Sequence, residues 1–146
     1  LVEGEIDGKP EFHGQHHRDE LDPPQPYPYL EMADEDHRLL TAAYWAMGEL
    51  IDAQVGRLLE TLEQTGQLEN TLVIFTSDHG EMLGDHGIYG KGPYFFEPAT
   101  HVPLVLSQPG GIEPGRSYAL VELVDLAPTL LEAAGIDIPP ACRASR

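Results

Sequence analysis

The sequence predicts an α/β fold, in which helices and strands alternate along the chain. Apolar residues recur at helical spacing over residues 36–66, and a continuous apolar run, TLVIFTSD, follows at residues 71–78. After a long connection come a second apolar run, at residues 102–111, and a second helical pattern, at residues 125–135. This order of helix, strand, connection, strand and helix is what an α/β domain requires.

The first helix is predicted to begin near Asp36, where a polar, proline-rich lead-in at residues 1–35 gives way to apolar residues three and four positions apart. Asp34 or Asp36 can cap its start, and Gly66 can end it in the left-handed backbone conformation.

The run TLVIFTSD is rich in β-branched and aromatic residues and does not alternate, which is typical of a strand buried on both faces of a parallel sheet. VPLVLSQPGG, at residues 102–111, predicts a second strand closed by a glycine-rich turn, and SYALVELVD, at residues 117–125, a short extended piece. DLAPTLLEAAG then predicts the second helix. Asp125 caps it, Pro128 is tolerated in its first turn, and Gly135 ends it.

The chain is strongly acidic. Eight Lys and Arg face 25 Asp and Glu, which gives a formal net charge of −17. Such a surface repels phosphate backbones and anionic lipid headgroups, so we expect no nucleic-acid partner and no membrane-surface binding. A single cysteine excludes an internal disulfide, and we expect neither a membrane span nor a signal peptide in these residues.

The first candidate site is the tripeptide Asp78-His79-Gly80, at the carboxyl end of the first strand, where ligands bind in open α/β sheets. If the backbone turns both side chains inward there, a carboxylate oxygen and an imidazole nitrogen meet one cation. Ca²⁺ or Mg²⁺ favours oxygen ligands, whereas Mn²⁺, Fe²⁺ or Zn²⁺ accepts the histidine readily. In this interpretation Gly80 permits the sharp exit from the strand. The alternative is an Asx-type turn with a capped loop and no ligand.

Lys91 is the second candidate, because it stands between two glycines in the long connection of residues 77–101. The glycines let the backbone come close to a ligand, and one lysine near a metal suits a tetrahedral oxyanion whose charge builds up during transfer. The alternative is an ordinary solvated lysine.

The stretch NTLVIFTSDHGEMLGDHGIYGKGPYFFEPATHVPLVL resembles the sulfatase family of the alkaline-phosphatase-like superfamily. AAYWAMGELIDAQVGRLLETLEQTGQLENT resembles the family's helix before this strand, and LVELVDLAPTLLEAAGIDIP its later helix. The resemblance implies a mixed sheet flanked by helices, present only in part. It divides the chain into a lead-in at residues 1–35, a partial catalytic domain at 36–140 and a truncated tail at 141–146.

By this resemblance, Asp78 and His79 correspond to metal ligands, and Lys91 to the lysine that contacts the sulfate and the leaving-group oxygen. The Asp-His form is similar to iduronate-type and choline-type sulfatases and to phosphonate monoester hydrolases. The expected metal is Ca²⁺, with Mn²⁺ as the alternative. The expected substrate is a small-molecule or glycan sulfate ester, with a phosphonate or phosphate ester as the alternative.

Five further histidines are weaker candidates. In the second Asp-His-Gly, at residues 85–87, His86 could lie near the substrate or help to protonate the leaving group. The alternative is a loop turn held by Asp85 and freed by Gly84 and Gly87. We expect His101 to be a packed or hydrogen-bonded residue, and the histidines of HGQHH, at positions 13, 16 and 17, to lie in a solvated loop.

CRASR, at residues 142–146, matches the Cys-x-Ala-x-Arg signature in which sulfatase cysteine becomes formylglycine. It follows a helix here, whereas in the family the signature precedes the metal strand, so we interpret Cys142 as a decoy. The formylglycine nucleophile is then expected upstream, and the 146 residues alone are expected to show little or no turnover and to self-associate through exposed apolar edges. The competing hypothesis of another class is a non-catalytic acidic module that binds a metal or a partner chain.

Overall fold

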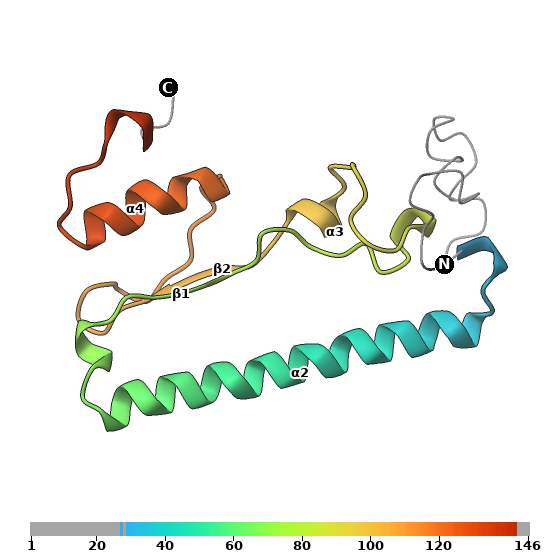
Figure 1. Ribbon diagram of the computed structural model, residues 1–146, viewed down its shortest axis with the longest axis horizontal. Coiled ribbons are helices and arrows are strands. Elements are labelled where there is room, and N and C mark those ends of the chain that lie inside the picture. Colours follow the sequence, from blue (N-terminus) through green and yellow to red (C-terminus); the bar gives the residue numbers. More distant parts are fainter. Residues whose placement is uncertain (1–26, 28, 143–146) are drawn as a thin grey trace.

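The computed structural model describes residue 27 and residues 29–142 of the chain (Figure 1). It contains the predicted order of a long helix, a strand, a long connection, a second strand and a second helix. The α-helices are α2 (Asp34–Gln64), α3 (Glu97–Thr100) and α4 (Leu126–Ala133), and the strands are β1 (Val73–Thr76) and β2 (Leu104–Ser107). Short 3-10 turns, labelled η, are η1 (Tyr29–Glu31), η2 (Leu68–Asn70), η3 (Asp85–Gly87), η4 (Leu123–Asp125) and η5 (Pro140–Cys142).

Helix α2 begins and ends close to the predicted positions. Its first turn carries three acidic residues, and Oδ2 of Asp36 accepts a hydrogen bond of 3.0 Å from the N–H of Ala33, the residue before the helix. At the other end Gly66 adopts a φ of 66°, and the N–H of Gln67 donates to the carbonyl of Leu62 at 2.8 Å. The predicted glycine stop is therefore confirmed, and it satisfies carbonyls that the helix leaves open.

Helix α4 confirms its glycine stop but not its predicted cap. Gly135 has a φ of 69°, and its N–H donates to the carbonyl of Glu132. The prediction that the Asp125 side chain caps α4 is wrong, because its Oδ2 accepts the N–H of Glu122 at 2.9 Å and so caps the preceding turn η4. The η4 turn was not expected, and residues 117–122 belong to neither a helix nor a strand.

The two strands pair antiparallel, with Val73 opposite Ser107 and Thr76 opposite Leu104. The interpretation of TLVIFTSD as a strand of a parallel sheet is not confirmed by this pairing, because the connection turns back at the carboxyl end of β1 instead of crossing to its amino end. The expected burial on both faces is also not found within the described chain. No residue of β1 is fully buried, and the side chain of Phe75 is 41% exposed.

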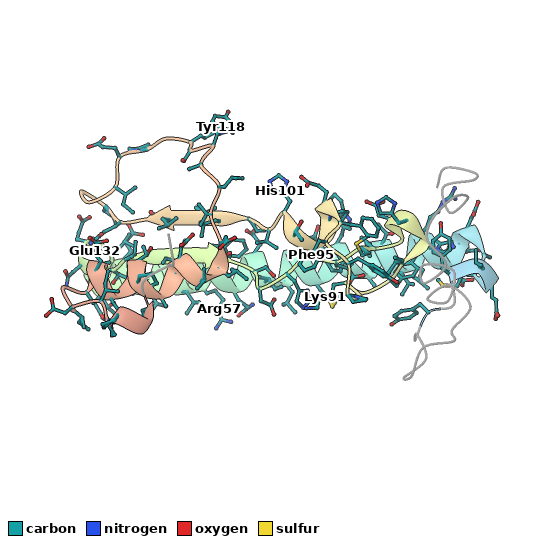
Figure 2. All side chains as sticks on the ribbon, turned by 90° about the horizontal axis from the view of Figure 1, so that it is seen from above. Arg57, Lys91, Phe95, His101, Tyr118 and Glu132 are labelled. Carbon is teal, nitrogen blue, oxygen red and sulfur yellow. The ribbon has the colours of Figure 1, made fainter. Side chains whose placement is uncertain are left out.

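The buried side chains of the described residues lie in the connection between the strands. Met82, Ile88 and Ala99 form a cluster there, and Tyr94 and Phe96 pack against it. By contrast α2, which runs along most of the molecule in Figure 1, has no buried residue. Trp45 on α2 is 68% exposed, and Tyr118 projects from the segment after β2 at 92% (Figure 2). Such apolar exposure agrees with self-association, which stays a prediction.

None of the helices in the described part of the chain combines the length and the apolar character that crossing a membrane requires.

Gly80 sits where β1 leaves the sheet and meets α3. Its N–H donates to the carbonyl of Ala99 at 2.8 Å, and a Cβ at this position would lie 1.9 Å from the carbonyl oxygen of Pro98. The φ angle of Gly80 lies outside the left-handed region. Contrary to the prediction from the sequence, glycine is therefore not required here for a sharp turn out of the strand. The close approach of the α3 backbone requires it.

We expect Gly80→Ala to lower the free energy of unfolding of the intact protein by about 1–3 kcal/mol, because the backbone of α3 must move away. The matched control is Gly48→Ala on α2, where nothing lies within 4 Å of the new Cβ. That variant should be neutral or more stable by up to about 1 kcal/mol, because alanine favours helix. Chemical unfolding measures both changes, and equal stabilities of the two variants would contradict the close approach.

Candidate active site

Asp78 and His79 follow β1 directly and are held in a tight turn. The hydroxyl of Ser77 donates to the carbonyl of His79 at 2.7 Å, and the N–H of His79 donates to Oδ1 of Asp78 at 2.9 Å. An Asx-type turn would instead bond the Asp78 side chain to the N–H two residues on. That N–H belongs to Gly80 and donates to Ala99, so the Asx-type alternative is not formed.

The His79 ring is oriented by the backbone carbonyl of the next residue, Gly80. Nδ1 lies 2.8 Å from the carbonyl oxygen of Gly80, which can only accept, so Nδ1 carries the proton and Nε2 keeps its lone pair. Nε2 lies 3.8 Å from Oδ2 of Asp78. Metal bonds of about 2.0–2.6 Å place two ligand atoms of one ion up to about 4–5 Å apart, so this pair fits a shared cation. A histidine oriented through its second nitrogen is usual at metal sites.

The electrostatics of the turn keep Asp78 ionised. The hydrogen bond from the N–H of His79 is the largest cause that lowers the pKa of the Asp78 carboxyl below its ordinary value, and the nearby His79 ring acts in the same direction. Lys91 lowers the same pKa more weakly. Because metal ligands must be deprotonated, the turn presents Asp78 in the form that binds a cation.

The side chains of His79 and Asp78 are 43% and 85% exposed. Within residue 27 and residues 29–142, no third His, Cys, Asp or Glu gathers with them into a group that could hold a metal ion. Ca²⁺ takes 6–8 oxygen ligands, so this pair supplies only part of a coordination shell.

Lys91 is exposed, and its two neighbouring glycines have positive φ angles, 73° for Gly90 and 55° for Gly92. Nothing lies within 4 Å of a Cβ placed on Gly90. The space around Gly90 is open, so close approach of a ligand to the backbone stays a prediction, and the left-handed turn gives a second reason for glycine at this position. Lys91 makes no hydrogen bond or ion pair with the residues that the structure describes, although its charge reaches Asp78.

Glu81 holds the loop that leads to Lys91, and the sequence analysis did not single it out. Its Oε1 accepts the N–H of Gly90 at 2.6 Å and the N–H of Leu83 at 3.1 Å, while the N–H of Met82 donates to the carbonyl of Gly90 at 3.1 Å. Both ends of residues 81–90 are thereby tied together. The sequence carries no signal that pairs Glu81 with Gly90, because the two residues are nine positions apart and Asp85 is a second acidic residue in the same stretch.

His86 lies in turn η3 with a φ of 54°, and its ring centroid is 4.1 Å from that of Phe96. Gly84 and Gly87, on either side, also have positive φ angles. The second Asp-His-Gly thus forms a loop turn packed on an aromatic ring, and a role of His86 in proton transfer stays a prediction. His101 is hydrogen-bonded as expected, with Nδ1 2.7 Å from Oε1 of Glu97 on the exposed surface.

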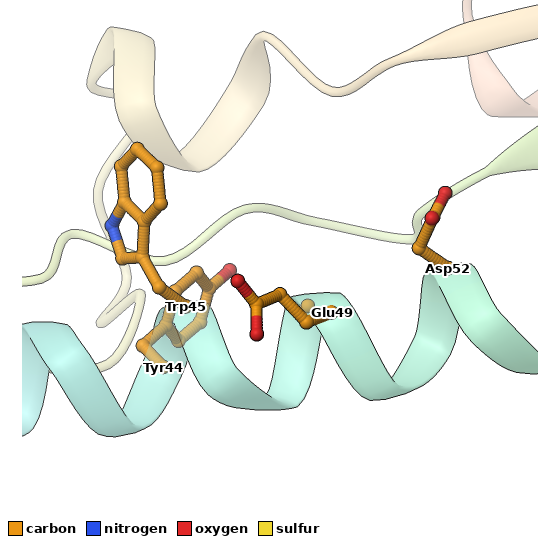
Figure 3. A pocket seen from close by; sticks show the side chains of 5 residues that line it. Tyr44, Trp45, Glu49 and Asp52 are labelled. Atoms are coloured by element: carbon orange, nitrogen blue, oxygen red, sulfur yellow. The ribbon is translucent and has the colours of Figure 1, made fainter.

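Among the hollows on the described surface are two that lie away from the candidate residues, and neither of them is lined by Asp78, His79 or Lys91. One, of about 390 Å³, is lined by a single stretch of α2 that includes Tyr44, Trp45 and Glu49 (Figure 3). The other, of about 710 Å³, lies between the start of α2 and the loop at residues 83–89. These two hollows therefore do not enclose the candidate residues, which are exposed in the described chain.

Cys142 ends turn η5, which lies beside α4 at the far side of the molecule from η3 (Figure 1). The rest of CRASR and the histidines at positions 13, 16 and 17 lie outside the described residues. The interpretation of Cys142 as a decoy stays a prediction.

Comparisons with known proteins point to one family. The sequence model of the family described as Sulfatase matches residues 12–136. Choline-sulfatase of Rhizobium meliloti (strain 1021) is 39% identical over 112 residues, which are 77% of this chain and 22% of that protein. Iduronate 2-sulfatase of Homo sapiens is 38% identical over 140 residues, with 79% of this chain and 25% of that protein covered.

A solved structure agrees with the sequence matches. It is that of BT4656 in complex with its substrate D-glucosamine-2-N,6-O-disulfate, at a TM-score of 0.59 and 40% sequence identity. The match covers 63% of this chain and 19% of that one. Part of the fold of that protein is therefore present here, and the chain spans about a quarter or less of the length of the curated relatives named above.

We expect Glu81→Ala to loosen the loop before Lys91, because it leaves the N–H groups of Leu83 and Gly90 without their acceptor. Unfolding should become easier by about 1–3 kcal/mol, and amide hydrogen exchange should accelerate at Gly90. Glu97→Ala is the matched control, since that carboxylate is exposed and bonds only the His101 side chain among the described residues. Equal effects of the two variants would rule out a holding role for Glu81.

Proposed function

The chain belongs to the sulfatase family, and on this premise we propose that the protein hydrolyses a sulfate ester with the help of one divalent cation. The observation that carries the proposal is the paired ligand geometry at the end of β1. Nε2 of His79 and Oδ2 of Asp78 lie 3.8 Å apart, and the charge of Lys91 is felt at the same carboxylate. Two metal ligands and a cation in reach of one another suit an anionic tetrahedral ester.

Asp78 and His79 would hold the cation, Ca²⁺ by expectation and Mn²⁺ as the alternative. The bound ion supplies positive charge that offsets the negative charge of the nucleophile and the ester oxygens. Lys91 binds the sulfate through its ammonium group and neutralises the leaving-group oxygen as the bond to sulfur breaks. The exposed position of Lys91, with no partner among the described residues, leaves the ammonium available for that contact.

The nucleophile is proposed to be a formylglycine outside residues 1–146. CRASR is a poor candidate, because it follows α4 in the chain, whereas by the family resemblance the signature precedes the metal strand. Relatives with four times the matched length have ample chain in which to carry such a residue. The 146 residues alone are then a partial site, with little or no turnover expected.

The substrate is proposed to be a sulfated sugar or a small sulfate ester. This rests on the names of the relatives, which include a choline-sulfatase and an iduronate 2-sulfatase, and on the disulfated glucosamine held by the structural relative. The strongly acidic composition, with a net charge of −17, makes a local cation such as Lys91 or a metal ion necessary for attracting an anion.

We expect Asp78→Asn to weaken Ca²⁺ or Mn²⁺ binding to the intact protein more than tenfold, because the site loses one of its charged ligands. The second Asp-His-Gly supplies the matched control, Asp85→Asn, which should leave the affinity unchanged. Calorimetric titration with each metal separately measures both. Equal affinities for Asp78→Asn and the unaltered protein would remove Asp78 from the metal site.

We expect Lys91→Ala to reduce kcat/KM of the intact protein for an aryl sulfate by about 10²–10³-fold, with the bound metal retained. Arg57→Ala is the control, because Arg57 is an exposed cation that bonds Gln54 on α2. Unchanged turnover with metal retained is the result expected of a non-catalytic module. Faster turnover of an aryl phosphonate than of the aryl sulfate would instead assign the protein to phosphonate or phosphate ester hydrolysis.

A further inference from the structure

We propose that the hydrogen bond between His37 and Tyr89 is a positioning contact that fixes the loop carrying Lys91 to the first turn of α2. The inference rests on the proposed role of Lys91. Neither His37 nor Tyr89 would touch the substrate. Their contact would decide where the ammonium group of Lys91 stands when the ester is bound.

The contact is short and partly buried. Nδ1 of His37 lies 2.6 Å from the hydroxyl oxygen of Tyr89, and the two residues are 52 positions apart in the sequence. The rings are stacked, with an interplanar angle of 12° and centroids 5.8 Å apart. Tyr89 is only 6% exposed. A buried hydroxyl without a hydrogen-bond partner would lower the free energy of unfolding by about 1–3 kcal/mol, so the folded state favours the bond to His37 once the Tyr89 ring is buried.

Other aromatic rings hold this pair in place. Tyr29, in η1, lies with its ring centroid 4.7 Å from that of His37 and 6.2 Å from that of Tyr89. The ring of Tyr27 meets Tyr89 edge-on at 5.8 Å. The start of α2, the residues just before it and the connection between the strands therefore meet at the ring of Tyr89. In Figure 1, η3 lies above the N-terminal part of α2.

The chemistry of Tyr89 suits a permanent hydrogen bond. Burial and the negative charge of Glu81 raise the pKa of the Tyr89 hydroxyl above its ordinary value. The hydroxyl therefore stays protonated at physiological pH and can donate to a neutral imidazole nitrogen.

The route from Tyr89 to Lys91 is one residue long. Gly90 follows Tyr89, and its N–H and carbonyl are both bonded, to Glu81 and to the N–H of Met82. Lys91 itself has no hydrogen bond to the described residues, so its place follows from the chain that precedes it. The Tyr89 side chain is bonded to His37, and the backbone of Gly90 is bonded to Glu81 and Met82. These bonds hold the two residues before Lys91 and so set the direction in which the backbone enters Lys91. A misplacement of about 1 Å can cost about 10²-fold in rate, so such a contact matters for catalysis.

The test uses Tyr89→Phe in the intact protein, which removes the hydroxyl and keeps the ring. We expect kcat for an aryl sulfate to fall about tenfold with little change in KM, since the proposed Lys91 contact strengthens as the leaving oxygen gains charge. His37→Leu should give the same loss, and His37→Asn should restore most of the rate because its amide can reach the position of Nδ1. Tyr44→Phe, which removes a hydroxyl from the exposed surface of α2, should change nothing.

A double-mutant cycle separates positioning from stability. If Tyr89 acts through Lys91, then Tyr89→Phe has no further effect on kcat in a Lys91→Ala background. An equal fold-loss in both backgrounds, or full activity of His37→Leu, overturns the proposal.

A second readout keeps the inference independent of the proposed function. If the unaltered protein hydrolyses no sulfate ester, the proposed function fails, and the contact is then measured by amide hydrogen exchange. Tyr89→Phe should accelerate exchange at Met82 and Gly90, whose N–H groups are bonded within the loop, and not at Phe75 in β1. Unchanged exchange at Met82 and Gly90 overturns the contact as a positioning device.

Discussion

The candidate site depends on one close approach, between the backbone of Gly80 and the backbone of α3. The N–H of Gly80 donates to Ala99, and no side chain fits between the two segments. This contact closes the connection on itself, so that Met82, Ile88 and Ala99 can form a buried cluster. The residues proposed to act on the ester are therefore positioned by the core of a connection, because the long helix and the two strands contribute no fully buried side chain.

The polar backbone groups of this connection are also bonded within the connection itself. A loop that folds on itself must satisfy its own N–H and carbonyl groups, and Glu81 and Gly90 do so from opposite ends of the segment. The bonded frame then ends at Lys91, which is left exposed. A hydrogen-bonded loop that ends in one solvated cation suits the binding of an anion. The loop is already ordered before the anion binds, so less conformational entropy is lost on binding.

Local features of this fold could be predicted from the sequence, and contacts between distant residues could not. Gly66 and Gly135 end their helices as predicted, because a glycine stop depends on neighbouring residues alone. The acceptor for the N–H of Gly90 and the partner of His37 lie elsewhere in the chain, and no spacing rule pairs them. The apolar run of β1 indicates that the strand favours apolar neighbours on both of its faces. It does not indicate the antiparallel pairing, which the path of the connection decides.

The two Asp-His-Gly copies show why identical residues need not share a role. In the first copy the backbone runs against α3, and the ring of His79 turns Nε2 toward Asp78. In the second copy Gly84 and Gly87 bend the chain into η3, and the ring of His86 lies on Phe96. The bend directs Ile88 and Tyr89 into the interior, and Lys91 follows two residues later. The second copy therefore shapes the loop that leads to Lys91, the cation proposed to meet the ester.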